Sequence, residues 1–196
     1  RGGGGGRGGG GGGGGRRVRL GGAGGVLALG GAHVTADIRD CLNTPLAAAE
    51  TLKRAHGTAI AHVLDPDEIV EVPGVGGRRP RPVKRTLLCN IIEARVAEIF
   101  RLAAEELDRA GYLETLAGGV ILSGGTANLH YIEELAEEAL GLPVARGCPK
   151  DLHGLVDVVS NPKYATSTGL ALCGLRDRHA GWFATWGAEA PKRRGF

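Results

Sequence analysis

The sequence predicts an α/β fold, in which short strands alternate with amphipathic helices. Two observations carry this prediction. Apolar residues recur at helical spacing through the stretch 86–111, which indicates one long helix. Short apolar runs at 119–123 and 143–146 flank a helical pattern at 129–140, which is the order of a β-α-β unit. The 196 residues are enough for one domain with a hydrophobic core.

The N-terminal segment 1–25 is set apart by its composition. Residues 1–15 contain only glycine and arginine, and we expect 1–25 to be disordered because it offers so little to bury. Its five arginines contribute +5 to a formal net charge of +3, which leaves −2 for the rest of the chain. Nucleic-acid binding through this segment is an alternative function, but aromatic residues for base stacking are missing there, so nucleic acid is not the expected partner.

The cysteines and histidines give no sign of a metal or catalytic centre. The four cysteines are dispersed without a Cys-x-x-Cys pair, which favours reduced thiols in a cytoplasmic protein. The six histidines do not cluster, and no Ser/His/Asp or Cys/His motif is recognisable. No apolar run has the length of a membrane span, and no signal peptide is expected. We therefore expect neither metal ligands nor catalytic residues.

The first half of the folded part begins near Val26. The stretch 26–38 predicts a short strand, a Gly30-Gly31 turn and the start of a helix. Thr44-Pro45 opens the next helix, because threonine is a common N-cap and proline suits the first turn, and Gly57 ends it. Residues 58–83 predict short strands and loops, with "PGVGGRRPRP" as a hairpin-like tip.

Glycines and one proline mark the element ends in the second half. Gly111 ends the long helix, and Gly141 ends the helix predicted at 129–140. Asn161-Pro162 combines a good N-cap with a first-turn proline and starts a final helix that runs to about Leu172.

The Gly124-Gly125 pair is the first candidate site. It lies in "VILSGGTANLHYI", directly after a predicted strand. A glycine pair there lets the backbone approach a ligand, and a following helix N-terminus offers free N–H groups to an anion. A tight turn is the alternative, and the pair taken alone favours the turn. Neither the P-loop nor the Rossmann glycine pattern is present.

Glu50 and Lys53 form the second candidate site. They lie at i,i+3 on one helix face, where they could hold a ribose hydroxyl and flank a base. An ordinary surface ion pair is the alternative. Gly30-Gly31 with Thr35 and Asp37 could form a second nucleotide-side turn, although such a pattern is more often a helix cap.

Two charged or aromatic patches have both an ordinary and a functional interpretation. The basic stretch "RRPRPVKR" at 78–85 is either a solvated loop or a receptor for an acidic peptide. Trp182, Phe183 and Trp186 lie close to a basic C-terminus, a combination that suits a membrane interface. Gly187 and Pro191 would interrupt a helix there, so a poorly structured tail is the alternative.

Five segments in order resemble the FtsA family of bacterial cell-division proteins, within the actin-like ATPase superfamily. They are "LGGAHVTADI", "TPLAAAETLKRAHGTA", "IIEARVAEIF", "GGVILSGGTANL" and "VSNPKYATSTGLALCGL". The resemblance implies an actin-like (ribonuclease H-like) second lobe over residues 26–175, with subdomain IIA carrying a IIB insertion at about 38–110. Residues 176–196 stand where the family has its membrane-targeting tail.

The resemblance also implies a nucleotide site. The family binds ATP in the cleft between two lobes. Gly124 and Gly125 match its adenosine-motif glycines, and Glu50 and Lys53 match the pair that contacts ribose and adenine. The Mg²⁺ ligands belong to the first lobe, which this chain lacks. Hydrolysis is therefore expected to be slow at most, and absent from this chain alone.

The family links polymers of the tubulin-like protein FtsZ to the inner membrane at the division septum, on its cytoplasmic face, and it self-associates. The stretch matching its site for the FtsZ C-terminal peptide contains Arg85, Glu93, Arg95 and Glu98. Membrane contact is expected from the tail with Trp182, Phe183 and Trp186. A chaperone-like or sugar-kinase-like ATPase of the same superfamily is the alternative.

The chain departs from the family pattern in two places. The Gly/Arg run stands where the second phosphate loop, Asp-x-Gly-Gly-Gly-Thr, is expected, and it has neither the Asp nor the Thr. Tyr131 stands where the adenosine motif has a further glycine, and we expect its ring to crowd the base. The chain is thus expected to be a fragment that carries half of a nucleotide site.

Overall fold

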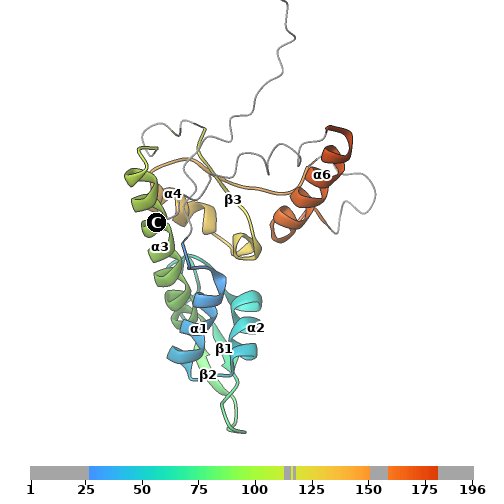
Figure 1. The fold of residues 1–196 in the computed structure, drawn as a ribbon. Coiled ribbons are helices and arrows are strands. Elements are labelled where there is room, and N and C mark those ends of the chain that lie inside the picture. The colour runs from blue at the N-terminus through green and yellow to red at the C-terminus, as the bar shows by residue number, and fades with distance from the viewer. Residues whose placement is uncertain (1–26, 113–115, 117, 151–158, 181–196) are drawn as a thin grey trace, which may run out of the picture.

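A computed structural model describes residues 27–112, 116, 118–150 and 159–180 (Figure 1). The predicted Gly/Arg-rich segment 1–25 lies outside these residues, as do Trp182, Phe183 and Trp186 of the tail. Two helices and a hairpin occupy one end of the molecule, and a small β-α-β unit occupies the other (Figure 1). The long helix α3 (Arg85–Arg109) runs along both.

Helices α1 (Gly31–Leu42) and α2 (Leu46–His56) pack against each other and against α3. Val34, Ile38 and Leu42 recur at i,i+4 and are buried, so one face of α1 belongs to the core. The helix predicted after Thr44 is confirmed, but Thr44 does not cap it. Its hydroxyl instead donates to the Pro73 carbonyl at 2.7 Å, which ties the α1–α2 connection to the neighbouring hairpin.

The short strand predicted before Gly30 is wrong for the described residues 27–29, which form no strand. A strand requires a hydrogen-bonded neighbour, and the described part of the chain supplies none beside these residues. The predicted helix start is confirmed, since α1 begins at Gly31.

The predicted hairpin-like tip is confirmed. Strands β1 (Ile69–Val72) and β2 (Arg81–Lys84) pair antiparallel, with Val70 opposite Val83. Val70, Val72 and Val83 are buried, so alternate residues of each strand face the core. Gly76 and Gly77 both have positive φ in the connecting turn, a backbone conformation that glycine adopts freely.

Helix α3 is the longest element and the largest contributor to the core. The helix predicted from the pattern at 86–111 is confirmed, with Gly111 in a left-handed conformation just past its end. Leu88, Ile92, Val96 and Phe100 recur every four residues and are buried. They belong to one hydrophobic cluster that also takes in side chains of α1, α2, the hairpin and α4 (Ile132–Leu140). This single cluster fixes both ends of the molecule relative to each other.

The predicted β-α-β order is confirmed by strand β3 (Val120–Leu122), helix α4 and strand β4 (Val144–Arg146), with the two strands parallel. The start of the helix was predicted at 129, which is wrong by three residues. A 3-10 turn η2 (Gly125–Asn128) comes first, and α4 begins only at Ile132. The cause is Tyr131, whose left-handed backbone (φ 61°, ψ 21°) separates the two.

The predicted cap Asn161-Pro162 is confirmed. The Asn161 side chain accepts a hydrogen bond from the Lys163 amide at 3.1 Å and caps the 3-10 turn η3 (Pro162–Tyr164). Helix α6 (Ala165–Ala180) follows directly and runs past Leu172, where we had expected it to end. Leu170 and Leu175 are largely exposed on it.

We predict that Tyr131→Gly is more stable than Tyr131→Ala by about 1 kcal/mol, because glycine adopts the left-handed conformation without the Cβ penalty that alanine pays. Urea unfolding of the two variants measures the difference. At Glu138, an exposed residue of α4, the order should be reversed: Glu138→Gly should be less stable than Glu138→Ala by about 1 kcal/mol. The same order of stability at both positions would contradict the backbone argument.

Candidate functional site

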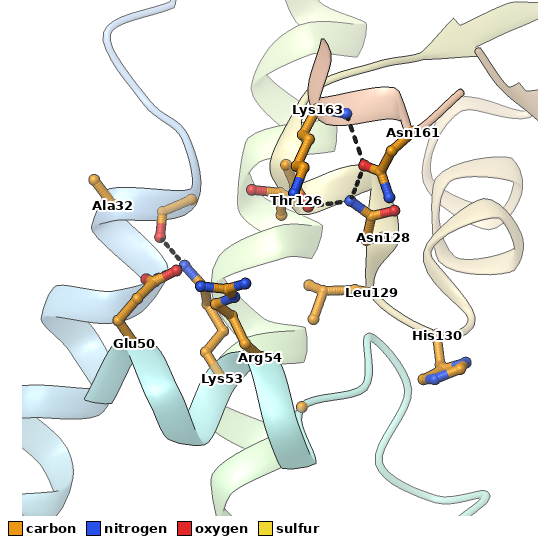
Figure 2. A pocket seen from close by; sticks show the side chains of 13 residues that line it. Ala32, Glu50, Lys53, Arg54, Thr126, Asn128, Leu129, His130, Asn161 and Lys163 are labelled. Carbon is orange, nitrogen blue, oxygen red and sulfur yellow. Dashed lines mark hydrogen bonds and ion pairs between the residues drawn. The ribbon is translucent and has the colours of Figure 1, made fainter. Parts of the chain in front are cut away.

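A cavity of about 740 Å³ lies where four separate parts of the chain meet (Figure 2). Its walls come from the start of α1, the exposed side of α2, the segment 125–130 and the turn η3. The lining residues are Gly31, Ala32, Glu50, Lys53, Arg54, Gly57, Gly125, Thr126, Asn128, Leu129, His130, Asn161 and Lys163. Three of the four residues predicted for the nucleotide site, namely Glu50, Lys53 and Gly125, thus line one cavity.

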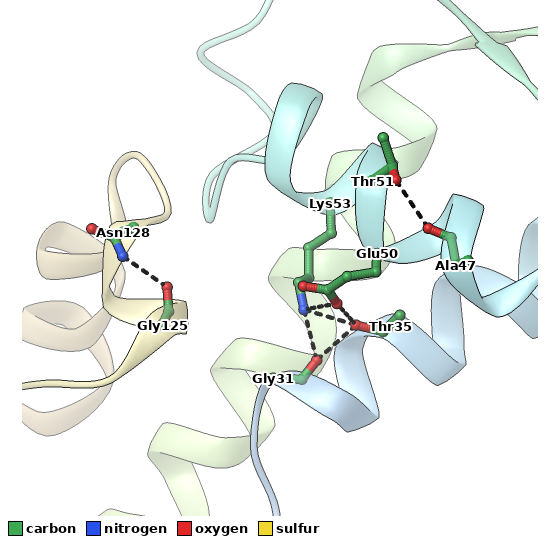
Figure 3. Close-up of polar contacts among 8 residues, drawn as sticks. All are labelled: Gly31, Thr35, Ala47, Glu50, Thr51, Lys53, Gly125 and Asn128. Atoms are coloured by element: carbon green, nitrogen blue, oxygen red, sulfur yellow. Dashed lines mark hydrogen bonds and ion pairs between the residues drawn. The ribbon is translucent and has the colours of Figure 1, made fainter. Parts of the chain in front are cut away.

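Glu50 and Lys53 belong to a compact hydrogen-bonded cluster with Thr35 and the Gly31 carbonyl (Figure 3). The Lys53 ammonium lies 2.6 Å from Glu50 Oε2, 2.7 Å from Thr35 Oγ1 and 3.0 Å from the Gly31 carbonyl oxygen. Thr35 Oγ1 also lies 2.6 Å from Glu50 Oε2. Lys53 is buried at 8% exposure, whereas the Glu50 side chain is 44% exposed. The pair is therefore more than the surface ion pair that was the alternative interpretation.

The cluster keeps Glu50 ionised. Partial burial pushes the pKa of Glu50 upward, but the hydrogen bonds from Lys53 and Thr35 and the positive charges of Lys53 and Arg54 outweigh it. The net effect is a pKa below the ordinary glutamate value. Glu50 thus presents a carboxylate, which only accepts hydrogen bonds, to the cavity at neutral pH.

The Gly124-Gly125 pair forms the turn between β3 and η2. Gly124 has φ 97° and ψ 173°, a conformation closed to residues with a Cβ, and its N–H donates to the Pro162 carbonyl at 3.0 Å. Gly125 lines the cavity, and a Cβ added to it would meet no atom within 4 Å. The first glycine therefore shapes the turn, and the second leaves open space beside the cavity.

Close packing and hydrogen bonds hold the opposite walls together. A Cβ at Gly31 would lie 2.3 Å from the Thr126 hydroxyl oxygen, so any larger residue would have to displace the threonine side chain for α1 to approach η2 this closely. Asn128 Nδ2 donates to Asn161 Oδ1 at 3.0 Å and connects η2 to η3 (Figure 2). Tyr131, which we expected to crowd a base, is not one of the described residues that line the cavity.

Several lining residues were not singled out from the sequence. Arg54 and Lys163 bring positive charge to the cavity from α2 and η3, and His130 lies at its edge (Figure 2). Arg54 directly follows Lys53, so its position next to the site was readable from the helix. Lys163 follows the Asn161-Pro162 cap, and no local pattern indicated that this turn would line the same cavity as Glu50.

The four residues predicted for peptide binding lie on two sides of α3. Arg85 donates to both carboxylate oxygens of Glu68, at 2.9 and 2.8 Å, and Glu93 accepts from the Ala61 amide at 2.7 Å. Both therefore serve contacts within the chain.

Arg95 and Glu98 lie together on the side of α3 that faces α1. Arg95 forms ion pairs with Asp37 of α1 and with Glu98. These residues line a second, shallower hollow of about 470 Å³ with Cys41, Asn90, Ile91 and Ala94. The structure thus groups two of the four predicted residues beside a hollow and separates the other two from it.

Among the described residues, no cluster of three or more His, Cys, Asp or Glu side chains could hold a metal ion. Within the same ranges, no helix is both long and apolar enough to cross a membrane.

The arrangement of elements defines an actin-like fold. Structures of MreB5 from Spiroplasma citri, one bound to AMPPNP and one bound to ADP, match this chain with TM-scores of 0.57 and 0.54. They cover 79% and 78% of this chain and 47% and 46% of their own, at 14% and 15% sequence identity. The predicted actin-like α/β fold is confirmed. The family model described as "Cell division protein FtsA" matches residues 21–169, and the chain belongs to the FtsA family.

Curated relatives agree with this assignment. The cell division protein FtsA of Pseudomonas aeruginosa is 40% identical over 156 residues, which are 80% of this chain and 37% of the relative. FtsA of Escherichia coli strain K12 is 37% identical over 152 residues, covering 74% of this chain and 36% of the relative. The chain thus spans less than two fifths of the length of these relatives.

We predict that the two glycines of the turn differ in their tolerance of alanine. Gly124→Ala should lower the free energy of unfolding by about 1–2 kcal/mol, because alanine is strained at a positive φ. Gly125→Ala should change it by less than about 0.5 kcal/mol, since the added methyl meets no atom. Urea unfolding tests both variants, and equal losses would show that the turn geometry is wrong.

Proposed function

We propose that this chain is the second, nucleotide-binding lobe of an FtsA-type division protein, and that the 740 Å³ cavity receives the adenosine part of ATP. The observation that carries the proposal is the meeting of Glu50, Lys53 and Gly125 in one cavity. They come from two motifs about 70 residues apart in the sequence, and both match the adenosine site of the FtsA family.

The chemistry of the cavity supports a nucleoside with phosphates. The volume lies within the range of about 300–1,000 Å³ that is usual for small-molecule sites. The Glu50 carboxylate accepts hydrogen bonds, as sugar hydroxyl groups require. Arg54 and Lys163 supply positive charge that suits phosphate groups. Gly125 leaves room for a ligand to approach the backbone.

The nucleotide acts as a structural ligand that controls assembly in this proposal. The curated relatives are far longer than this chain, and the family places ATP between two lobes. The groups that would hold Mg²⁺ and position the γ-phosphate are assigned to the other lobe. The lobe described here therefore supplies adenosine contacts and no hydrolytic step, and any ATPase activity of the whole protein is slow.

We further propose that the protein links FtsZ polymers to the cytoplasmic face of the cell membrane at the division septum and assembles into actin-like polymers. The hollow beside Arg95 and Glu98 is the better candidate for the FtsZ C-terminal peptide, because these two residues line it, whereas Arg85 and Glu93 are not among the described residues that do. Trp182, Phe183 and Trp186, outside the described residues, are proposed to contact the membrane.

The family membership favours this proposal over the other two. A chaperone-like or sugar-kinase-like ATPase would share the actin-like fold but not the match to the FtsA family over residues 21–169. A nucleic-acid-binding role would depend on residues 1–25, and it predicts salt-sensitive RNA binding that disappears when they are deleted.

We predict that the isolated chain binds ATP with a dissociation constant on the order of 1 mM or weaker, because one lobe encloses only part of the ligand. Gly125→Ala should weaken this binding at least about tenfold, since its methyl group occupies space that the ligand needs. NMR titration with ATP measures both values, and Gly174→Ala in α6, outside the cavity lining and with no atom near the added methyl, is the control. Micromolar binding by the chain, or unchanged binding by Gly125→Ala, would contradict the proposed site.

We predict that Arg95→Glu weakens binding of the FtsZ C-terminal peptide at least about tenfold, because it reverses the charge beside the hollow. Arg101→Glu is the matched control on the same helix, with its charge outside the hollow. Fluorescence anisotropy with a labelled peptide measures the affinities.

Arg95→Glu also places a third acid beside Asp37 and Glu98. The double variant Asp37→Arg/Arg95→Glu restores the ion pair between α1 and α3. It should regain thermal stability without regaining wild-type peptide affinity. Absence of peptide binding by the folded wild-type chain, or equal losses in Arg95→Glu and Arg101→Glu, would exclude this hollow.

A further inference from the structure

The parallel sheet of β3 and β4 has one edge that side chains close. On the outer side of β4, the Val144 amide donates to the Glu137 carboxylate at 3.0 Å. The Arg146 amide donates to the Glu133 carboxylate at 2.8 Å in the same way. Both glutamates belong to α4 and take the place that a further strand would occupy. This edge therefore offers neither N–H group to another chain.

The outer edge of β3 is open. The Val120 amide donates to the Pro143 carbonyl at 2.8 Å, so the backbone groups of Val120 face β4. Neighbouring residues of a strand direct their N–H and C=O groups to opposite sides, so both groups of Ile121 face away from β4. Among the described residues, neither group has a hydrogen-bond partner. The edge at Ile121 can therefore receive another strand.

The side chain of Ile121 extends this open edge onto one face of the sheet. Val120 and Leu122 pack against the core cluster on the other face. Ile121 is 72% exposed, and its cross-strand neighbour Ala145 is exposed as well. Parallel sheets are normally covered on both faces, and an isolated pair of strands is only marginally stable. A partner at this edge would thus stabilise the sheet.

The sequence around β3 lacks the residues that discourage strand pairing. Residues 116–129 carry no charged side chain and no proline. The hairpin strands, in contrast, carry Glu71, Arg81, Pro82 and Lys84, which are typical of edges protected against pairing. A second copy of this chain would therefore meet β3 without like charges facing one another.

We propose that β3 is a dimerisation strand: two copies of this chain pair β3 with β3 in antiparallel orientation across a two-fold axis at Ile121. The Ile121 N–H of each copy then donates to the Ile121 carbonyl of the other. The two Ile121 side chains lie opposite each other on the exposed face, and such β-branched pairs stabilise sheets. A second copy fits this edge because a two-fold axis pairs the same open groups with each other.

The closed edge of β4 limits this assembly to two copies. The joined sheet has a β4 strand at each outer edge, and Glu133 and Glu137 block both of them. The contact is thus closed and does not continue into a fibre. None of the described β3 residues lines the 740 Å³ cavity, so the dimer is independent of the nucleotide and of the polymers proposed above.

Sedimentation equilibrium of the full chain, without nucleotide, should show a reversible equilibrium between monomer and dimer. Ile121→Lys should weaken dimerisation at least about tenfold, because it places two ammonium groups opposite each other. Ile121→Thr keeps a β-branched, uncharged side chain and should stay within about threefold of the wild type. Leu87→Lys is the matched control, since Leu87 is 49% exposed at the hairpin end of α3 (Figure 1).

Amide hydrogen exchange tests the same contact in the unmodified chain. The Ile121 amide should become protected as the protein concentration rises through the dimerisation range, because the second copy supplies its acceptor. The Val120 and Val144 amides are internal controls, since they are bonded within the chain and their protection should not depend on concentration. This measurement needs no substitution, so it tests the dimer even if Ile121→Lys does not fold.

Three results would overturn the inference. A chain that stays monomeric at its highest soluble concentration, with a freely exchanging Ile121 amide, would exclude a second copy as the partner. An Ile121 amide that is protected at every concentration would show that another segment of the same chain covers the edge. Assembly that requires ATP and is equal in Ile121→Lys would belong to the polymers of the proposed function and not to a β3 dimer.

Discussion

The buried ammonium group of Lys53 is the constraint on which the site depends. A cation removed from water must be fully hydrogen-bonded, or its desolvation would destabilise the fold. Here the partners come from two helices, Gly31 and Thr35 on α1 and Glu50 on α2 (Figure 3). Satisfying one charge thus fixes the two helices relative to each other. It also orients the Glu50 carboxylate, which is the acidic group of the cavity lining.

The same wall is held against the rest of the molecule by packing. Leu88, Ile92 and Val96 of α3 belong to a core cluster that includes residues of α1 and of α4. Above this core, Gly31 lets α1 approach Thr126, which no residue with a Cβ could do without displacing the threonine. The cavity is therefore a consequence of the core and of one close backbone approach. Its lining residues come from parts of the chain that the core brings together.

The sequence predicted local features of the site well. Glu50 and Lys53 were paired because i,i+3 residues share a helix face, and the strand-to-helix turn at Gly124 was recognisable from its glycines. Simple helix geometry could also have separated Glu93 from Arg95, since residues two apart lie about 200° apart around a helix. Glu93 and Arg95 were nevertheless predicted together, because the match to the FtsZ-peptide site was made along the sequence and did not distinguish the faces of α3.

By itself, the sequence determined the order of helices and strands, the family, and the types of residue available to the site, because spacing and turn chemistry act over a few neighbouring residues. Only the tertiary structure decided that Thr35 Oγ1 lies 2.6 Å from the carboxylate of Glu50, which is 15 residues away in the sequence. It also decided that the Lys53 side chain is buried and that η3 forms one wall of the cavity. These outcomes depend on which buried polar groups form hydrogen bonds with one another. The partners are determined only when segments far apart in the sequence pack into one core and exclude the water between them.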